Sequence, residues 1–255
     1  MKSTSIRMKP LIAANWKMNK SIKEADSFIK EFNKFCDSNT ADIVICPPFT
    51  IMPSLSGMIK GTGIKLGSQN MHFEERGAFT GEISPLMVRE LNCEYVIIGH
   101  SERRQYFKED DALINKKVKS ALNHGLKPIL CVGETLEQRQ SKSAMKVIKN
   151  QIAGCLNNVD KYEMKNIVIA YEPVWAIGTG KNATPEQAQE VHAYIKKLLS
   201  EIYSDSIASK VRIIYGGSVK PENAKELLSM KDIYGALVGG ASLDAKSFAA
   251  ICNSV

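Results

Sequence analysis

Residues 167–176 read IVIAYEPVWA, four apolar residues followed at once by Tyr171, Glu172 and Pro173. A short run that is apolar on both faces is typical of a strand in a parallel sheet, because helices cover both faces of such a sheet. The proline restricts the preceding residue, Glu172, to extended backbone geometry. This stretch therefore predicts a buried strand, with the carboxylate of Glu172 held in a fixed direction at its C-terminal end.

Seven further runs of this kind occur along the chain, separated by segments with helical periodicity. The eight predicted strands cover residues 11–14, 43–45, 64–67, 95–98, 128–131, 167–170, 211–214 and 235–238. The clearest helices are residues 111–124 and 185–203, and the second has an N-cap threonine and a first-turn proline at Thr184 and Pro185. Eight strand–helix units could close into a barrel or lie open as a doubly wound sheet.

The position of the polar and glycine-rich segments favours the barrel. They follow the C-terminal ends of five strands, at residues 15–19, 99–104, 171–181, 215–219 and 237–241. One end of a barrel gathers the loops of all its strands into a single site. We therefore predict an α/β fold, a single-domain (β/α)8 barrel over residues 9–255, preceded by a flexible N-terminal tail at residues 1–8.

Composition places the chain among folded soluble proteins, with 44% hydrophobic and 24% charged residues. The net charge of +7 comes from lysines spread at helix-like intervals rather than gathered in one block, and we find no RNA-binding motif. We therefore predict no nucleic-acid or membrane partner. Because no apolar run is long enough for a membrane span or a secretory signal, we expect a cytoplasmic protein.

The cysteines and the other potential ligands give no sign of a metal or cofactor. The six cysteines contain no C-x-x-C pair and are irregularly spaced, so we interpret them as small buried hydrophobic residues in a reducing compartment. No aspartate or histidine cluster has metal-ligand spacing, and no G-x-G-x-x-G follows the first strand. We predict no cofactor and no metal.

Three polar residues at strand ends are candidates for catalysis. Glu172 alone could be a surface or capping acid, but its place at the open end suits a general base. His100 could be a structural histidine; it precedes a segment that can open a helix, and a helix N-terminus favours a neutral imidazole. Lys17, taken alone, could be an ordinary solvated lysine, and Glu102 could form an ion pair with it.

The glycines after three strands could be turn residues or a phosphate site. Backbone amides without side chains can close around a phosphate, and the loops after strands seven and eight form the common phosphate site of barrels. Ser218 would add a donor to such a site. The glycines concerned are Gly178, Gly216, Gly217, Gly239 and Gly240.

The five segments together resemble the signature segments of the triosephosphate isomerase family, in order and spacing, from about Lys9 onward. The resemblance implies a cofactor-free TIM barrel enzyme of glycolysis and gluconeogenesis. Its substrate would be a triose phosphate, with dihydroxyacetone phosphate and D-glyceraldehyde 3-phosphate interconverted by proton transfer through an enediolate. Glu172 would be the base, His100 a hydrogen-bond donor to the substrate oxygens, and Lys17, beside Asn15, a stabiliser of negative charge.

The resemblance also implies a substrate-binding set, a supporting set and a lid. The substrate-binding residues would be Asn15, Lys17, Gly178, Ser218, Gly239 and Gly240. The supporting residues would be Ser101, Glu102, Tyr215, Gly216, Gly217 and Leu237. The lid would consist of Pro173, Val174, Trp175, Ala176, Ile177, Gly178, Thr179, Gly180 and Lys181.

Residues 69–82 show no helical or strand pattern and resemble the loop through which two subunits of the family interdigitate. Thr80 would reach the neighbouring active site of a homodimer, whereas an ordinary surface loop would leave Phe79 exposed. Two positions depart from the family pattern. Tyr234 replaces a usual acid and Lys108 a common glycine, which puts a supporting salt bridge and a loop conformation in doubt.

Two other kinds of protein remain as alternatives. One is another phosphate-binding barrel enzyme: a class I aldolase would need a Schiff-base lysine where strand six ends in Glu172, and a metal-dependent epimerase would need the missing ligand cluster. The other is a noncatalytic basic protein that binds RNA or a membrane surface.

Overall fold

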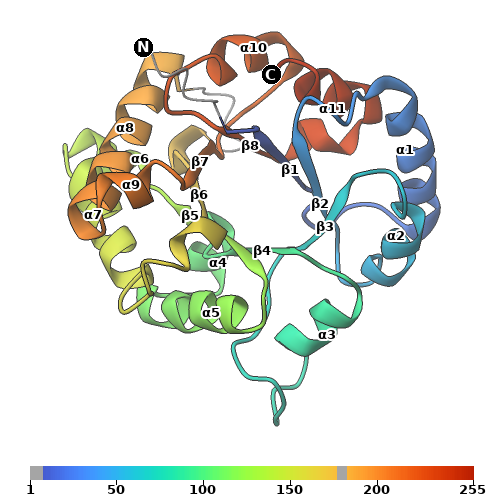
Figure 1. Ribbon diagram of the computed structural model, residues 1–255, viewed down its shortest axis with the longest axis horizontal. Helices are drawn as coiled ribbons and strands as arrows, with labels where there is room; N and C mark the ends of the chain where they lie inside the picture. The colour runs from blue at the N-terminus through green and yellow to red at the C-terminus, as the bar shows by residue number, and fades with distance from the viewer. Residues whose placement is uncertain (1–7, 177–182) are drawn as a thin grey trace.

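Eight parallel strands form a closed barrel in the order β1 to β8, with helices arranged around it (Figure 1). The computed structural model describes residues 8–176 and 183–255. The strands are β1 (Leu11–Asn15), β2 (Asp42–Cys46), β3 (Lys65–Ser68), β4 (Tyr95–Ile98), β5 (Lys127–Val132), β6 (Val168–Tyr171), β7 (Arg212–Tyr215) and β8 (Gly235–Val238). The predicted (β/α)8 barrel is confirmed, and the open sheet is excluded because β1 pairs with both β2 and β8.

The outer ring consists of helices that follow the strands, and several predicted boundaries are confirmed to within one residue. The α-helices are α1 (Ile22–Phe35), α2 (Met52–Met58), α3 (Pro85–Glu90), α4 (Ser101–Tyr106), α5 (Asp111–Asn123), α6 (Leu136–Gln140), α7 (Ala144–Cys155), α8 (Pro185–Ile202), α9 (Asp205–Ala208), α10 (Pro221–Leu228) and α11 (Ala245–Cys252). Three 3-10 helices are η1 (Met164–Asn166), η2 (Val174–Ala176) and η3 (Gly240–Leu243). At the start of α8, the Thr184 side chain accepts from the amide of Gln187 as the predicted N-cap.

Alternate strand residues build two apolar layers. Residues such as Leu11, Ala13 and Val44 pack together in one cluster, while their neighbours Ile12 and Ala14 belong to the larger cluster that includes helix residues. This is the period of two expected for strands buried on both faces, with one set inside the barrel and the other beneath the helices. Burial on both sides explains why the strands are apolar throughout.

The barrel closes where β8 lies against β1, and one glycine makes this contact possible. A Cβ atom at Gly235 would lie 1.9 Å from the carbonyl oxygen of Leu11, and the residue has φ +139°. No other residue type fits this position without moving the strand, because the clash is with backbone rather than with a flexible side chain. The seam of the barrel therefore depends on Gly235.

The N-terminal end of the barrel carries a set of paired charges, here called the floor ion pairs. Asp42 and Glu94 each bridge two cations, at nitrogen–oxygen distances between 2.8 and 3.6 Å. All six side chains are partly exposed to solvent. The floor ion pairs comprise Lys9, Asp42, Lys65, Glu94, Lys127 and Arg212.

The two departures from the family pattern have local explanations. Lys108 adopts φ 57°, in the left-handed region that favours glycine. Lys196 pairs with Asp232 at 2.8 Å and lies 5.5 Å from the ring centroid of Tyr234, so the lysine keeps a carboxylate partner despite the tyrosine. Among the cysteines, Cys36 differs from the prediction because it is only partly buried.

Two predictions fall wholly or partly on undescribed residues. Residues 1–7 of the predicted tail lie outside the described part of the chain, and so do Ile177 to Lys181 of the predicted lid. The boundary at residue 9 stays a prediction. Within the described ranges, no helix has the length and apolar character needed to cross a membrane.

Candidate active site

The structure brings most of the predicted site residues to one cavity at the C-terminal ends of the strands. The cavity has a volume of about 670 Å³ and draws its walls from loops after β1, β4, β6, β7 and β8. It also extends over the start of α10 to Lys220 and Glu222. The predicted residues that line it are Asn15, Lys17, His100, Glu102, Glu172, Gly216, Gly217, Ser218, Leu237, Gly239 and Gly240.

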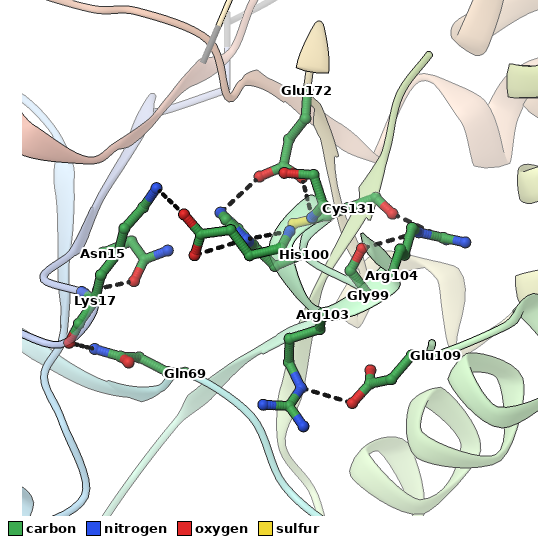
Figure 2. Close-up of polar contacts among 12 residues, drawn as sticks. Asn15, Lys17, Gln69, Gly99, His100, Arg103, Arg104, Glu109, Cys131 and Glu172 are labelled. Carbon is green, nitrogen blue, oxygen red and sulfur yellow. Dashed lines mark hydrogen bonds and ion pairs between the residues drawn. The ribbon is translucent and has the colours of Figure 1, made fainter. Parts of the chain in front are cut away.

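Glu172 is 2% exposed, and its two carboxylate oxygens have different surroundings. Oε2 accepts a hydrogen bond of 2.8 Å from the backbone amide of Ser101. Oε1 lies 3.1 Å from Nε2 of His100 but makes no well-aligned hydrogen bond within the described residues (Figure 2). The amide therefore anchors one oxygen and leaves the other available to accept a proton.

The backbone around Glu172 is held by β5 and β7. Its amide donates to the carbonyl of Val132 at 2.8 Å, and the amide of Gly216 donates to the carbonyl of Tyr171 at 2.7 Å. A Cβ atom at Gly133 would lie 1.7 Å from the carbonyl oxygen of Glu172. Gly133 was missed from the sequence because its requirement comes from an approach between neighbouring strand ends, which no local motif records.

His100 is the N-cap residue of α4, and its ring carries the proton on the nitrogen that faces Glu172. Nδ1 accepts from the backbone amide of Glu102 at 3.2 Å, so Nδ1 has no proton. The carboxylate oxygen Oε2 of Glu102 lies farther from Nδ1, at 3.6 Å. A neutral imidazole with its proton on Nε2 follows from this hydrogen bond, in agreement with the helix-terminus argument.

Lys17 has φ 51° and is held in this left-handed conformation by three contacts. Its amide donates to Oδ1 of Asn15 at 3.1 Å, and its carbonyl accepts from Nε2 of Gln69 at 2.8 Å. Its ammonium lies 2.5 Å from Oε1 of Glu102, the pairing expected from the sequence (Figure 2). A strained residue held from several sides is a mark of functional sites, and Gln69 is a contributor that the sequence did not reveal.

The glycines of the site fall into two groups. A Cβ atom at Gly216 or Gly217 would lie 2.8 Å from Cγ of Glu172 or 2.2 Å from the hydroxyl of Tyr215, so these glycines permit close packing behind the site. At Gly239 the nearest atom would be Cε of Lys17, at 3.7 Å, and at Gly240 nothing lies within 4 Å. The second pair leaves open backbone beside a lysine, which suits an anion.

The described part of the predicted lid, Pro173 to Ala176, contains η2 and is tied to a buried carboxylate. Glu134 is fully buried, and its Oε1 accepts from Trp175 Nε1 at 2.9 Å, Tyr171 Oη at 3.1 Å and Arg139 Nη1 at 3.0 Å. Burial raises the pKa of Tyr171, and the Glu134 charge adds to the effect. Glu134 was missed because an acid after strand five carries no signal apart from its place at a strand end.

The other three histidines, His72, His124 and His192, do not line the cavity. His192 is fully buried in α8, and burial lowers its pKa to about 4. Its Nδ1 lies 3.2 Å from the carbonyl of Asp232. Within residues 8–176 and 183–255, no three His, Cys, Asp or Glu side chains are grouped as metal ligands.

A buried carboxylate with a free oxygen, a neutral imidazole and a lysine at the mouth of a (β/α)8 barrel define an enzyme that moves protons on a small anionic substrate. Comparison with known proteins gives the particular family. The family model described as triosephosphate isomerase matches residues 10–255. The chain belongs to the triosephosphate isomerase family.

Individual relatives agree over almost the full length of the chain. A triosephosphate isomerase of Clostridium botulinum (strain Okra / Type B1) is 54% identical over 243 residues, which is 95% of this chain and 98% of the relative. Triosephosphate isomerases of Alkaliphilus metalliredigens and Dictyoglomus thermophilum are each 54% identical over 245 residues, 96% of this chain and 99% and 98% of the relatives.

Proposed function

We propose that the cavity interconverts dihydroxyacetone phosphate and D-glyceraldehyde 3-phosphate, the triose-phosphate isomerase reaction of glycolysis and gluconeogenesis, with Glu172 as the base. The observation that carries this assignment is the pair of unequal oxygens on Glu172. Because the Ser101 amide fixes Oε2, Oε1 can take a proton from one substrate carbon and return it to the adjacent carbon. One carboxylate then serves both half-reactions, and no external proton carrier is required.

His100 and Lys17 complete the electrostatics of the reaction. The proton on Nε2 of His100 is directed toward the space beside Glu172, where it can be donated to the carbonyl or enediolate oxygen of the substrate. The ammonium of Lys17, positioned with Asn15, stabilises negative charge that develops on the same oxygens. Every step uses side chains of the protein itself, so the reaction proceeds without a cofactor or metal.

The substrate phosphate would lie against Gly239 and Gly240, with Ser218 as a further donor. These residues line the same cavity as Glu172, and their open backbone faces Lys17. The start of α10 lies at the same wall, although Glu222 limits the positive potential there. Leu237 lines the same cavity, and the Tyr215 hydroxyl packs directly against Gly217. The lid over residues 173–181 remains a prediction, of which only Pro173 to Ala176 are described.

The assignment is tested by an assay that separates it from the alternatives. Interconversion of the two triose phosphates is measured by a coupled dehydrogenase assay in the presence of a metal chelator. We expect full activity after chelation and no covalent substrate adduct on borohydride reduction. Loss of activity with chelator would favour the metal-dependent epimerase type, and a trapped Schiff base would favour the aldolase type.

We also propose that the protein is a cytoplasmic homodimer. A loop between β3 and α3 projects from the barrel (Figure 1). Phe79 in this loop is 44% exposed in the single chain, and its ring centroid lies 4.2 Å from that of His72. Several other large apolar side chains are exposed, and two of them lie beside Phe79, since Met87 and Phe107 each line a surface hollow together with it. They include Met18, Leu86, Met87, Tyr106 and Phe107. All six cysteines are free, as expected in a reducing compartment.

The dimer can be tested at its projecting loop. Phe79→Asp should convert a dimer into monomers of about 28.2 kDa in sedimentation. Because Thr80 would complete the neighbouring site, the monomers should also lose most activity. Tyr162→Asp, on an exposed aromatic far along the chain, serves as the control and should remain dimeric. A fully active wild-type monomer at nanomolar concentration would contradict the proposal.

A further inference from the structure

Cys36 differs from the other five cysteines of the chain. It is partly exposed, whereas Cys46, Cys93, Cys131, Cys155 and Cys252 are buried. A buried cysteine usually acts as a small apolar residue, but a thiol within reach of solvent can meet an oxidant. Cys36 is therefore the cysteine that an oxidant can reach first, and it lies next to another cysteine, Cys252.

Cys36 and Cys252 lie at the ends of two adjacent helices. Cys36 is the C-cap residue of α1, Cys252 is the last residue of α11, and the two helices run side by side (Figure 1). The Asn253 side chain ties the helix ends together, because its Oδ1 accepts from the Asp37 amide at 3.0 Å and its Nδ2 donates to the Phe35 carbonyl at 2.8 Å. The backbone on both sides of Cys36 is therefore fixed relative to Cys252.

The Cys36 and Cys252 thiols are neighbours at these helix ends, and their environments give them different reactivities. The neighbouring Cys252 thiol lowers the pKa of the Cys36 thiol. Burial raises the pKa of the Cys252 thiol far above its usual range, and the neighbouring Cys36 adds to this effect. Cys36 is thus the more readily ionised, accessible thiol, and Cys252 is a protected thiol held against it.

We propose that Cys36 and Cys252 form a reversible disulfide when a hydroperoxide oxidises Cys36. The Cys36 thiolate attacks the peroxide, the O–O bond breaks, and a sulfenic acid forms on Cys36 while hydroxide leaves. The sulfur of Cys252 then attacks the sulfenic sulfur; the S–O bond breaks, and the departing hydroxyl takes the Cys252 proton as water. A dithiol reductant reverses the reaction by thiol–disulfide exchange.

The position of this disulfide predicts its consequence. It would join the first and the last α-helix across the seam where β1 pairs with β8, linking segments 216 residues apart in the chain. The C-terminal ends of α1 and α11 lie at the floor end of the barrel, since these helices run antiparallel to the strands. The cross-link would therefore stabilise the closed barrel without touching the catalytic mouth.

The test begins with reduced protein, freed of reductant and treated with hydrogen peroxide at a small molar excess. We expect a mass loss of about 2 Da, a peptide pair linked through Cys36 and Cys252 in a non-reducing digest, and a rise in Tm on the order of 10 °C. The isomerase kcat should stay within about two-fold, and dithiothreitol should restore the original mass and Tm.

Variants show whether the pair itself is responsible. Cys36→Ser, at a partly exposed site, should abolish both the linkage and the peroxide-induced rise in Tm. Cys252→Ala should instead leave Cys36 to proceed to sulfinic acid, a mass gain of about 32 Da. Cys93→Ala, a matched buried cysteine, should behave as the wild type. A wild-type Cys36 that remains reduced, reaches sulfinic acid, or links to any cysteine other than Cys252 would overturn the proposal.

Discussion

The floor and the mouth of the barrel both carry charged side chains, but the charges are arranged differently. At the floor, Asp42 and Glu94 each have two cationic partners and remain accessible to water. At the mouth, Glu172 is buried and one of its oxygens lacks a hydrogen bond from the described residues. An exposed, paired carboxylate costs little, whereas a buried, incompletely paired one costs stability.

The two arrangements separate the stability of the fold from its function. A single strand contributes to both ends of the barrel. β7 begins at Arg212, which belongs to the floor ion pairs, and is followed by the glycines after Tyr215, which line the cavity at the mouth. The charges at the floor pair with one another, so removing one of them should lower the free energy of unfolding slightly and leave catalysis unchanged. The mouth groups are positioned for a substrate, so their loss should be severe for catalysis and should not lower the free energy of unfolding.

Substitution of Glu172 should have the largest effect. Glu172→Asp retains the charge but withdraws it by roughly 1 Å, and a displacement of this size costs on the order of 10²-fold in rate. That factor corresponds to about 2.7 kcal/mol of transition-state stabilisation. Glu172→Gln should lose more, because an amide cannot accept the proton. Steady-state kinetics should show the loss mainly in kcat. A Glu172→Gln variant with a kcat close to that of the wild type would rule out Glu172 as the base.

Substitution of Lys17 should have a comparable or smaller effect. Lys17→Met removes the positive charge from the cavity while keeping much of the side-chain volume, and we expect a loss in kcat/KM on the order of 10²-fold. Lys23→Met changes an exposed lysine of α1 and should leave kcat/KM unchanged. Circular dichroism checks that both variants are folded. Equal kinetics in the two variants would show that Lys17 is an ordinary surface lysine.

Substitution of Gly239 should affect binding more than chemistry. In Gly239→Val the branched side chain would project into the space beside Lys17, where the substrate phosphate is proposed to lie. Inhibition by a phosphate-bearing substrate analogue should weaken by about 10-fold, equivalent to about 1.4 kcal/mol of binding free energy. Gly57→Val, in α2 with no atom within 4 Å of the added Cβ, is the matched control. Unchanged inhibition would move the phosphate site elsewhere.

Substitution at the floor should have the smallest effect. Glu94→Gln breaks two partly exposed ion pairs, and we expect a loss of about 0.2–1 kcal/mol in the free energy of unfolding with unchanged kcat. Burial alone would raise the pKa of Glu94, but the interactions with Lys65 and Lys127 together lower it. The stability contribution is therefore present above the unfolded-state pKa of about 4.3 and is lost as the pH falls through the lower folded-state value.

Denaturant titrations between pH 3 and pH 7 test this prediction. The wild type should be slightly more stable than Glu94→Gln at pH 7, and the two should converge at the acid end. A difference that grows on acidification, or a change in kcat, would contradict the separation between floor and mouth.

The sequence predicted eight buried strands because burial on both faces makes each of them apolar throughout, and the polar segments after five of these strands favoured a barrel over an open sheet. It also predicted which strand ends face the cavity, since polar residues directly after apolar runs stand out. Glu134, Gln69 and Gly133 were missed because their importance comes from contacts between strands distant in the chain. The interpretation of all cysteines as buried residues failed at Cys36 because exposure at a helix end depends on packing.

Isotope exchange shows directly whether Oε1 of Glu172 transfers the proton. Substrate is incubated with enzyme in D₂O, and deuterium at the reacting carbons is followed by NMR. We predict that the wild type introduces deuterium during turnover, while Glu172→Gln binds the phosphate-bearing analogue with nearly unchanged affinity but gives no enzyme-dependent exchange. Deuterium incorporation by a folded Glu172→Gln variant at the wild-type rate would show that another group moves the proton.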